Sequence, residues 1–221
     1  EKYVTLKRMK SGKRASRGGL SLEEAAYGDS ESIGYVFQAL DARTGKVLWE
    51  RQSQGTHYWR VPIVVDDEVL LVDGFAHTVF AYSIPTGKLL WQAQFESFFA
   101  APPWIIDGRI YLYMRLPKKK TIIQYVLNPD TGEIIHQTDM QVNSLYAKPA
   151  IIDKTLFYYD PVAYSLLGID REFGGVTGRQ PVAKWLTTVS KRNVVTFEGQ
   201  GKSIYFYSWD GLVLKLDVGS Q

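Results

Sequence analysis

The sequence of 221 residues contains no cysteine. Disulfide bonds, cysteine-ligated zinc, thioether-linked haem and thiol catalysis are therefore excluded. The compartment stays open, because a chain without cysteine suits both oxidising and reducing surroundings. The sequence also lacks any run of about 18 apolar residues, so it predicts no membrane span. It shows no signal peptide and does not begin with Met, and we therefore expect a mature form or a fragment of a longer protein.

The motifs of nucleotide-binding and hydrolytic enzymes are missing as well. Ser11-Gly12-Lys13 lacks the first glycine of a phosphate-binding loop and precedes no helical pattern. No Gly-x-Ser-x-Gly, His-Glu-x-x-His or Gly-x-Gly-x-x-Gly string occurs. The histidines are 20 and 59 residues apart with no repeated carboxylate beside them, which argues against zinc. The sequence thus predicts no catalytic residue, no cofactor and no metal site, and we do not expect an enzyme.

Positive charge is concentrated at the start of the chain, whose net charge is +3 and pI about 8.9. Residues 1–18 hold seven basic side chains and one acidic one, which gives +6 and leaves −3 for the remainder. The candidate electrostatic arm comprises Lys7, Arg8, Lys10, Lys13, Arg14 and Arg17. A solvated arm, and an arm that docks on an acidic protein or anionic lipid surface, both stay open. Nucleic acid is the least favoured partner, because no aromatic side chain for base stacking follows Tyr3 in this segment.

The rest of the chain is built from an internal repeat. The pattern Ala-Leu-Asp-x-x-Thr-Gly-Lys-x-Leu-Trp occurs, with decreasing fidelity, at residues 39–49, 81–91 and 126–136. A fourth copy contains Gly174, 42 residues after the turn glycine of the third, with Trp185 displaced by an apparent insertion, and a fifth begins at Lys215. A second motif, Pro followed by three hydrophobic residues and Asp, occurs in step with the first at residues 62–66, 103–107 and 149–153.

Each repeat of 41 to 46 residues contains four short runs rich in β-branched and aromatic residues, separated by turn signals. This length and pattern are typical of a β-propeller blade. We therefore predict an all-β fold, a propeller of four-stranded antiparallel blades over residues 33–221, with residues 1–32 as a basic, largely irregular N-terminal arm. In this arrangement Asp41, Asn128, Asp170 and Asp217 cap tight turns, and Trp49 and Trp91 pack between blades.

About four to five blades are visible. The complete or nearly complete ones are expected at residues 58–94, 100–140, 146–188 and 192–217, the last without its outer strand. Residues 35–41 and 46–52 are the third and outer strands of a further blade, and residues 3–8 are a candidate for one more strand. An arc of a larger propeller, and a propeller completed by another chain or by residues outside this sequence, both stay open.

The repeated Leu-Asp-x-x-Thr-Gly-Lys-x-Leu-Trp string and the Pro-led strand resemble the PQQ-like β-propeller repeat family. The resemblance covers residues 33–217. The family includes pyrroloquinoline-quinone dehydrogenases and non-catalytic members, such as the propeller lipoprotein of the outer-membrane β-barrel assembly machinery. None of the enzymes' Asp, Glu and Asn cofactor residues matches a position here, and the vicinal disulfide is impossible without cysteine. The resemblance therefore implies a non-catalytic member without a cofactor, in the periplasm or otherwise exported.

The meander topology predicts that the loops between blades share a face with the loops between second and third strands. On this face the sequence gathers aromatic side chains and a lysine cluster, whereas the Thr-Gly-Lys turns opposite are small and polar. The candidate interface comprises His57, Tyr58, Trp59, Phe75, Phe98, Phe99, Lys118, Lys119, Lys120, Tyr146 and Trp209. We predict a non-catalytic scaffold that presents this face to a protein in a larger complex. Rings that cap the central channel, a fragment of a PQQ-dependent dehydrogenase and a carbohydrate-binding propeller remain as alternatives.

Overall fold

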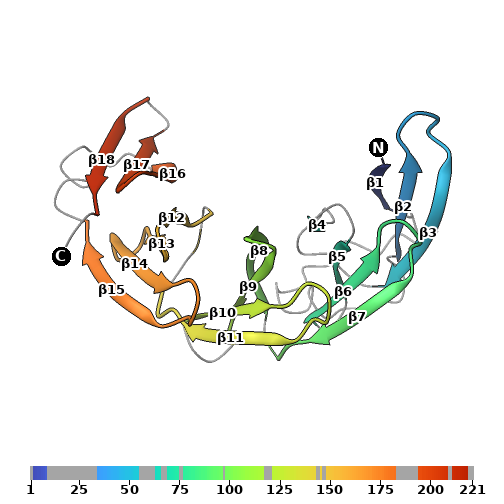
Figure 1. Ribbon diagram of the computed structural model, residues 1–221, viewed down its shortest axis with the longest axis horizontal. Helices are drawn as coiled ribbons and strands as arrows, with labels where there is room; N and C mark the ends of the chain where they lie inside the picture. The colour runs from blue at the N-terminus through green and yellow to red at the C-terminus, as the bar shows by residue number, and fades with distance from the viewer. Residues whose placement is uncertain are drawn as a thin grey trace, which may run out of the picture. The chain divides into compact units, whose positions relative to one another are not determined.

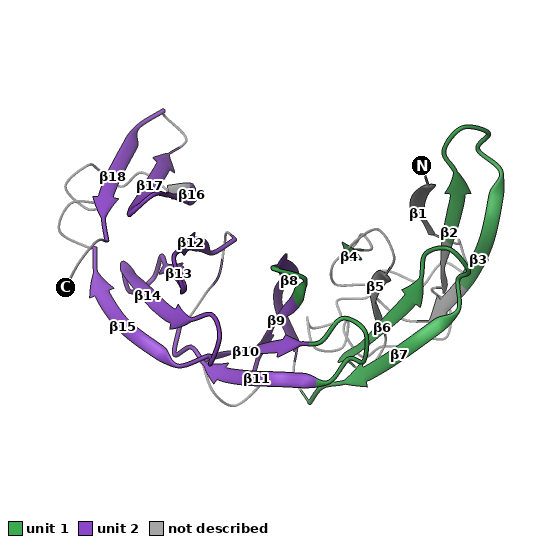
Figure 2. Cartoon of the chain, viewed as in Figure 1, with its two compact units in different colours: residues 1–96, 107–109, 128–133 green, residues 97–106, 110–127, 134–221 purple. Residues whose placement is uncertain are grey.

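The computed structural model contains two compact units, coloured separately in Figure 2. It describes residues 2–8, 34–54, 63–65, 69–74, 77–96, 98–116, 121–142, 145, 148–182, 194–208 and 211–218. Unit 1 comprises residues 1–96, 107–109 and 128–133, and unit 2 comprises residues 97–106, 110–127 and 134–221.

Five antiparallel sheets account for all the strands in the described residues (Figure 1). The first sheet contains β1 (Lys2–Arg8), β2 (Gly34–Asp41) and β3 (Val47–Gln54). The second contains β4 (Ile63–Val65), β5 (Val69–Gly74), β6 (Thr78–Ser83) and β7 (Leu89–Gln94). The third contains β8 (Phe98–Ile106), β9 (Arg109–Arg115), β10 (Ile122–Leu127) and β11 (Ile134–Asp139). The fourth contains β12 (Ala150–Ile152), β13 (Thr155–Asp160), β14 (Ser165–Asp170) and β15 (Val176–Pro181), and the fifth contains β16 (Val194–Gln200), β17 (Ser203–Ser208) and β18 (Val213–Asp217).

In every sheet the strands that are neighbours in sequence are also neighbours in space. This meander is the blade predicted from the repeat, and the all-β propeller of four-stranded antiparallel blades is confirmed. The expectation that residues 3–8 supply a strand is also confirmed, because β1 pairs with β2 in the register Lys2↔Asp41 to Arg8↔Tyr35. The last sheet has three strands in the described residues, in agreement with the predicted lack of an outer strand.

Burial is deepest in the middle strands of the third and fourth sheets. In β9, the five residues from Ile110 to Met114 have no exposed surface, whereas β7 and β11 are largely exposed. The core of unit 2 contains two clusters of buried hydrophobic residues. One cluster joins strands of β8–β11 to β12–β15 and includes Tyr113 and Tyr158, and the other joins β12–β15 to β16–β18 and includes Phe197 and Phe206. Packing between successive sheets therefore contributes to the hydrophobic stabilisation of this unit.

The tight turns between third and outer strands are capped as predicted. The Oδ1 atom of Asp41 accepts hydrogen bonds from the backbone N–H groups of Arg43 (3.1 Å) and Thr44 (2.8 Å). Asn128 and Asp170 accept the corresponding bonds in the third and fourth sheets. Asp217 differs, because its described partners are the Ser203 hydroxyl and the Lys215 ammonium group instead of backbone N–H groups.

The repeat tryptophans pack on the turn of the following repeat. The Nε1–H of Trp49 donates to the carbonyl oxygen of Ile84 at 2.6 Å, and its ring lies so close to Gly87 that an added Cβ would be 2.6 Å from Cδ2. Trp91 repeats this arrangement on the turn at residues 128–133, where it donates to the Pro129 carbonyl at 2.6 Å. The predicted role of both tryptophans in packing between blades is therefore confirmed.

The tryptophan position changes in the later repeats. His136 occupies it in the third sheet, where its ring lies against Gly174, so this histidine has a packing role as well. In the fourth sheet the register Gly168↔Gly178 is equivalent to Ala81↔Trp91, which assigns the position to Gly178. Trp185, which the sequence suggested for this position, lies outside the described residues.

Candidate protein-binding face

Most of the predicted interface falls outside the part of the chain that the structure describes. His57, Tyr58, Trp59, Phe75, Lys118, Lys119, Lys120, Tyr146 and Trp209 lie outside it, as do Lys10, Lys13, Arg14 and Arg17 of the predicted arm. Lys7 and Arg8 belong to β1. Phe98 and Phe99 are the described members of the interface set, and both start β8 in unit 2.

Phe98 and Phe99 differ in exposure because successive side chains of a strand point to opposite faces. Phe98 is 38% exposed, whereas Phe99 is 7% exposed and belongs to the core. Of the two rings, Phe98 is therefore the more exposed.

A second exposed segment on the same face was missed by the sequence analysis. It is the turn between β13 and β14, the connection between the second and third strands of its sheet, where Val162 is 61% and Tyr164 43% exposed. In a propeller this turn lies at the same end of the sheets as the start of β8. The sequence Asp160-Pro161-Val162-Ala163-Tyr164 could have indicated this exposed turn, because it combines turn residues with an aromatic side chain between two strands.

The turn between β13 and β14 is held in a defined conformation. The buried Asp160 accepts hydrogen bonds from the N–H groups of Val162 (2.9 Å) and Ala163 (3.1 Å) through Oδ1. Tyr164 adopts φ +48°, in the left-handed region that non-glycine residues rarely occupy. Such a conformation costs about 1 kcal/mol or more and is concentrated at binding and active sites. The turn thus presents Val162 and Tyr164 from a rigid base.

Val213 adds a third exposed apolar segment to this end of unit 2. It is 52% exposed and follows the turn between β17 and β18, where Ser208 N–H donates to the Leu212 carbonyl at 3.0 Å. We call Phe98, Val162, Tyr164 and Val213 the loop face of unit 2. Its members come from three different sheets, so that their presentation depends on the propeller scaffold.

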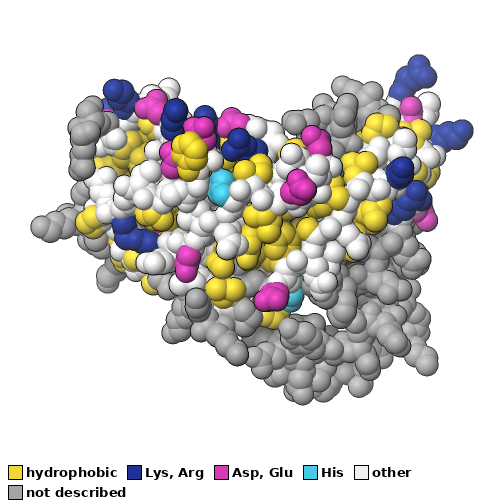
Figure 3. Space-filling view, turned by 60° about the horizontal axis from the view of Figure 1, so that its bottom comes forward, with side chains coloured by type: hydrophobic (Ala, Val, Ile, Leu, Met, Phe, Trp, Pro, Cys, Tyr) yellow, Lys and Arg dark blue, Asp and Glu magenta, His cyan; other side chains and the backbone are white. Residues whose placement is uncertain are grey.

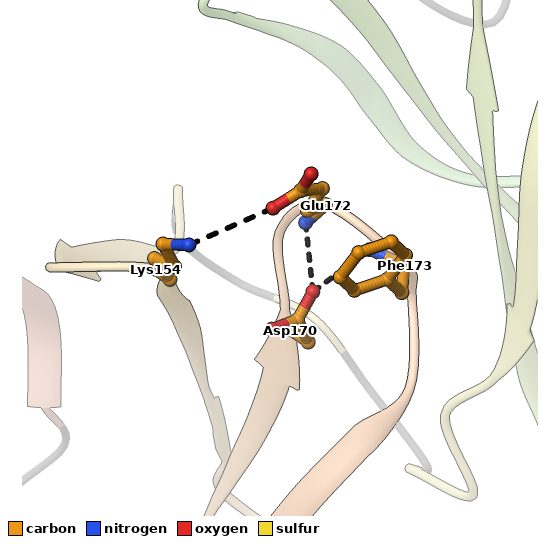
Figure 4. A network of polar contacts seen from close by, with 4 residues as sticks. All are labelled: Lys154, Asp170, Glu172 and Phe173. Atoms are coloured by element: carbon orange, nitrogen blue, oxygen red, sulfur yellow. Dashed lines mark hydrogen bonds and ion pairs between the residues drawn. The ribbon is translucent and has the colours of Figure 1, made fainter.

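The opposite ends of the sheets carry the capped turns, which are mostly polar as predicted. The fourth sheet departs from this pattern (Figure 4). There the Asp170 carboxylate accepts from the N–H groups of Glu172 (2.9 Å) and Phe173 (2.7 Å), and Lys154 Nζ lies 3.8 Å from Glu172 Oε2. The Phe173 ring projects from this turn and is 75% exposed. This end therefore has one exposed aromatic side chain of its own among the described residues.

The outer strands carry further exposed hydrophobic side chains, which the sequence analysis did not single out. Three outer strands begin with two such residues: Val47 and Leu48 in β3, Leu89 and Leu90 in β7, and Ile134 and Ile135 in β11, each between 43% and 51% exposed, whereas β15 begins with one, Val176, which is 53% exposed. Figure 3 shows hydrophobic side chains interspersed with acidic and basic ones on this side of the molecule. The apolar pair after the first three turns is visible in the repeat. Such a pair is equally typical of a buried strand, so the sequence alone did not indicate that it is exposed.

A buried polar cluster joins the third and fourth sheets within unit 2. Tyr158 donates to Gln124 Oε1 at 2.7 Å, and its hydroxyl lies 3.0 Å from that of Tyr113. Burial is the main cause that raises the pKa of both tyrosines well above the ordinary value, and it also raises the pKa of Tyr159 to about 12. These phenols stay protonated at physiological pH, so they act as hydrogen-bonding groups of the core.

The described residues contain no group of three or more His, Asp or Glu side chains that could hold a metal ion. His77, between β5 and β6, has a pKa lowered by burial and therefore favours the neutral form. No helix in the part of the chain that the structure describes is long and apolar enough to cross a membrane.

Comparison with known families gives a match over most of the chain. A family model described as "Outer membrane protein assembly factor BamB" matches residues 33–220. A curated relative, tetrathionate hydrolase of Acidithiobacillus ferrooxidans, is 32% identical over 134 residues, which are 55% of this chain and 25% of the relative. The chain thus spans about a quarter of the length of this relative.

Solved structures resemble the chain at low sequence identity. Sqt1 of Saccharomyces cerevisiae is 11% identical with a TM-score of 0.58, and the match covers 84% of this chain and 53% of Sqt1. The computationally designed protein Ika8 is 13% identical with a TM-score of 0.56, over 84% of this chain and 55% of Ika8. At these identities the likeness extends to the fold alone.

Proposed function

We propose that this chain, which belongs to the outer membrane protein assembly factor BamB family, is a non-catalytic scaffold that binds a protein partner in a larger assembly. Membership confirms the resemblance to the PQQ-like propeller repeat inferred from the sequence. A periplasmic or otherwise exported location and a role as a complex subunit are part of the proposal, because the family is named for assembly at the outer membrane.

The observation that carries the proposal is the loop face of unit 2. Aromatic and aliphatic side chains exposed at loop tips, on a rigid scaffold, are favoured anchors in protein interfaces. Phe98 and Tyr164 supply aromatic rings, and Val162 supplies an aliphatic side chain. The hydrogen bonds to the Asp160 carboxylate fix the turn that contains Val162 and Tyr164. Little conformational entropy is lost when a partner binds such a preformed surface.

The aromatic residues predicted at the same face but outside the described residues, such as Trp59 and Trp209, extend the proposed interface. The basic segment at residues 1–18 supplies an electrostatic contact to an acidic protein surface in this proposal.

Photo-cross-linking tests the proposal. A photoreactive amino acid is placed at Phe98 or Tyr164, and the matched control carries it at Phe173, which is more exposed but lies at the opposite end of its sheet. We expect cross-links to a partner protein, in cells of the organism of origin, from positions 98 and 164 and not from 173. Cross-links from all three positions alike, or from 173 alone, would refute the assignment of the face.

A second candidate function is hydrolysis of tetrathionate, favoured by the relative that is 32% identical over 134 residues. The purified chain is incubated with tetrathionate, and the loss of tetrathionate is measured against a blank without protein. Under the scaffold proposal the two rates are equal. Turnover that is lost on heat inactivation would show that the chain is an enzyme and would overturn the scaffold proposal.

A further inference from the structure

One of the rings that dock on a turn can take up a proton. In the described residues three rings lie against the turn glycine of the following repeat: Trp49 on Gly87, Trp91 on Gly132 and His136 on Gly174. The three glycines have φ between +67° and +73°, so the sites share one backbone geometry. An indole is uncharged at every physiological pH, whereas the ordinary pKa of an imidazole is about 6.5. The contact between the third and fourth sheets is therefore built around an ionisable group.

The site of His136 is otherwise constructed like the first one. Two residues after the ring, Arg51 Nε donates to the Gly87 carbonyl at 2.8 Å. At the equivalent position, Thr138 Oγ1 donates to the Gly174 carbonyl at 2.6 Å. The third and fourth sheets thus keep the hydrogen bond to the glycine and have imidazole in place of indole.

The imidazole of His136 is enclosed by its neighbours. Both ring nitrogens, Nδ1 and Nε2, have almost no solvent-exposed surface. A Cβ added to Gly174 would lie 2.8 Å from Cε1 of the ring and 2.9 Å from the Thr138 hydroxyl oxygen. Because desolvation disfavours the charged form of histidine, the ring fits this site as the neutral form.

The turns that face the ring carry charged residues of both signs. They are Asp170, Arg171 and Glu172 in the turn between β14 and β15, and Asp153 and Lys154 in the turn between β12 and β13. The Asp170 carboxylate accepts from the N–H groups of Glu172 and Phe173, and Glu172 Oε2 lies 3.8 Å from Lys154 Nζ (Figure 4). The Arg171 N–H donates to the Lys154 carbonyl at 2.8 Å, and the Arg171 guanidinium adds a positive charge that opposes a second one on the ring.

The strands beside His136 add two more carboxylates. Glu133 Oε2 accepts from the Thr131 hydroxyl at 3.3 Å, and Asp139 Oδ1 accepts from the Gln141 N–H at 3.1 Å. Directly opposite His136 on β10 lies the buried Val126, and opposite Val126 on β9 lies Tyr111, whose phenol is neutral in acid. Glu133, Asp139, Asp170 and Glu172 thus each have a partner other than the imidazole.

We propose that His136 makes the contact between the third and fourth sheets sensitive to acid. The neutral ring packs on Gly174 and holds the two sheets together, and a protonated ring leaves the site because its charge is disfavoured away from water. The proposal does not depend on the scaffold function, since the turn with Gly174 is at the opposite end of the sheets from the loop face.

The direction of the pH dependence follows from proton linkage. In the unfolded chain His136 takes up a proton as the pH falls through about 6.5, whereas the packed ring stays neutral, so the unfolded state binds more protons. The stabilisation from this contact is therefore present above the ordinary pKa of histidine and is lost as the pH falls below it.

Urea unfolding of the 221-residue chain at pH 7.5 and pH 5.5 tests the proposal. Between these values the unfolding constant of the wild type should rise about tenfold more than that of H136Q, which cannot ionise. H136W should show the same reduced pH dependence, and its Nε1–H can donate to the Arg171 carbonyl as Trp49 and Trp91 do to the equivalent carbonyls. The other histidines are present in every variant, so the differences report on position 136.

The matched control is T138V, which removes the hydrogen bond to the Gly174 carbonyl without changing a charge. It should lower the stability at both pH values and keep the wild-type pH dependence. A purely structural role of His136 would make H136Q behave like T138V, and that result would overturn the proposal.

NMR titration of the imidazole protons gives a second measurement on the folded wild type, with the His136 signals identified by their absence from H136Q. We expect this ring to remain neutral at pH 5.5, where a free imidazole is mostly protonated. A ring that is protonated at pH 5.5 in the folded chain would overturn the proposal, even if neither variant at position 136 folds.

Discussion

Substitution of Gly87 by alanine measures how much the docking of Trp49 contributes to the free energy of unfolding. Gly87 has φ +67°, and a Cβ added to it would lie 2.6 to 2.9 Å from three atoms of the Trp49 ring. The alanine therefore introduces a conformational penalty of about 1 to 2 kcal/mol and also displaces the ring from its site. Complete loss of a buried tryptophan costs about 3 to 5 kcal/mol, and partial displacement costs less.

Gly45 provides the matched control, because it occupies the equivalent turn with φ +68° and has no atom within 4 Å of an added Cβ. G45A should therefore show the conformational penalty alone. We expect G45A to lower the free energy of unfolding by about 1 kcal/mol and G87A by about 3 to 4 kcal/mol. For a chain of this size these values correspond to losses in Tm of about 2 to 4 °C and about 6 to 16 °C.

Urea and thermal unfolding followed by tryptophan fluorescence and circular dichroism give both values. A double-mutant cycle with W49A completes the test, since G87A should cost no more than G45A once the ring is gone. Equal losses for G87A and G45A in the presence of Trp49 would refute the reasoning, because the ring would then make no close contact with the turn.

Two further predictions concern the buried tyrosines. Y158F removes the hydrogen bond to Gln124 Oε1 and leaves a buried acceptor without its donor, so we expect a loss of about 1 to 3 kcal/mol in a urea melt, against almost none for the exposed control Y164F. The stability of the wild type should fall as the pH rises above about 10, because Tyr113 and Tyr158 lose their protons in the unfolded chain while the raised pKa values keep them protonated in the folded chain. The slope should approach about 1.4 kcal/mol per pH unit for each of these tyrosines and be shallower in Y158F, and a stability that stays constant from pH 9 to pH 11 would contradict this account.

The repeat allowed the fold to be predicted in detail, because its turn chemistry and packing recur. Asp41, Asn128 and Asp170 cap equivalent turns, and Trp49 and Trp91 dock on equivalent glycines, so an assignment in one copy transfers to the next. Local sequence also indicated a strand at residues 3–8, which the structure contains as β1, paired with β2.

The candidate site could be predicted only in part. Phe98 and Phe99 are adjacent in sequence and chemically identical, and only the alternation of the strand decides that one is exposed and the other buried. The exposed turn with Val162 and Tyr164 escaped notice because the fourth repeat is degraded, which obscured where its second strand ends. The register of the fourth sheet was needed to assign the tryptophan position to Gly178, since nothing in a degraded repeat indicates which residue replaces the tryptophan.

The docking of each outer-strand aromatic on the turn of the next repeat also limits how such a sequence can change. Gly87 tolerates a side chain only if Trp49 becomes smaller, and the two positions lie one repeat apart. Substitutions at the two positions should therefore be inherited together. Duplication or deletion of a whole repeat would preserve every pair of aromatic and glycine, whereas recombination within a repeat would separate them. The chain can thus gain or lose blades as complete units more readily than it can alter one of its turns.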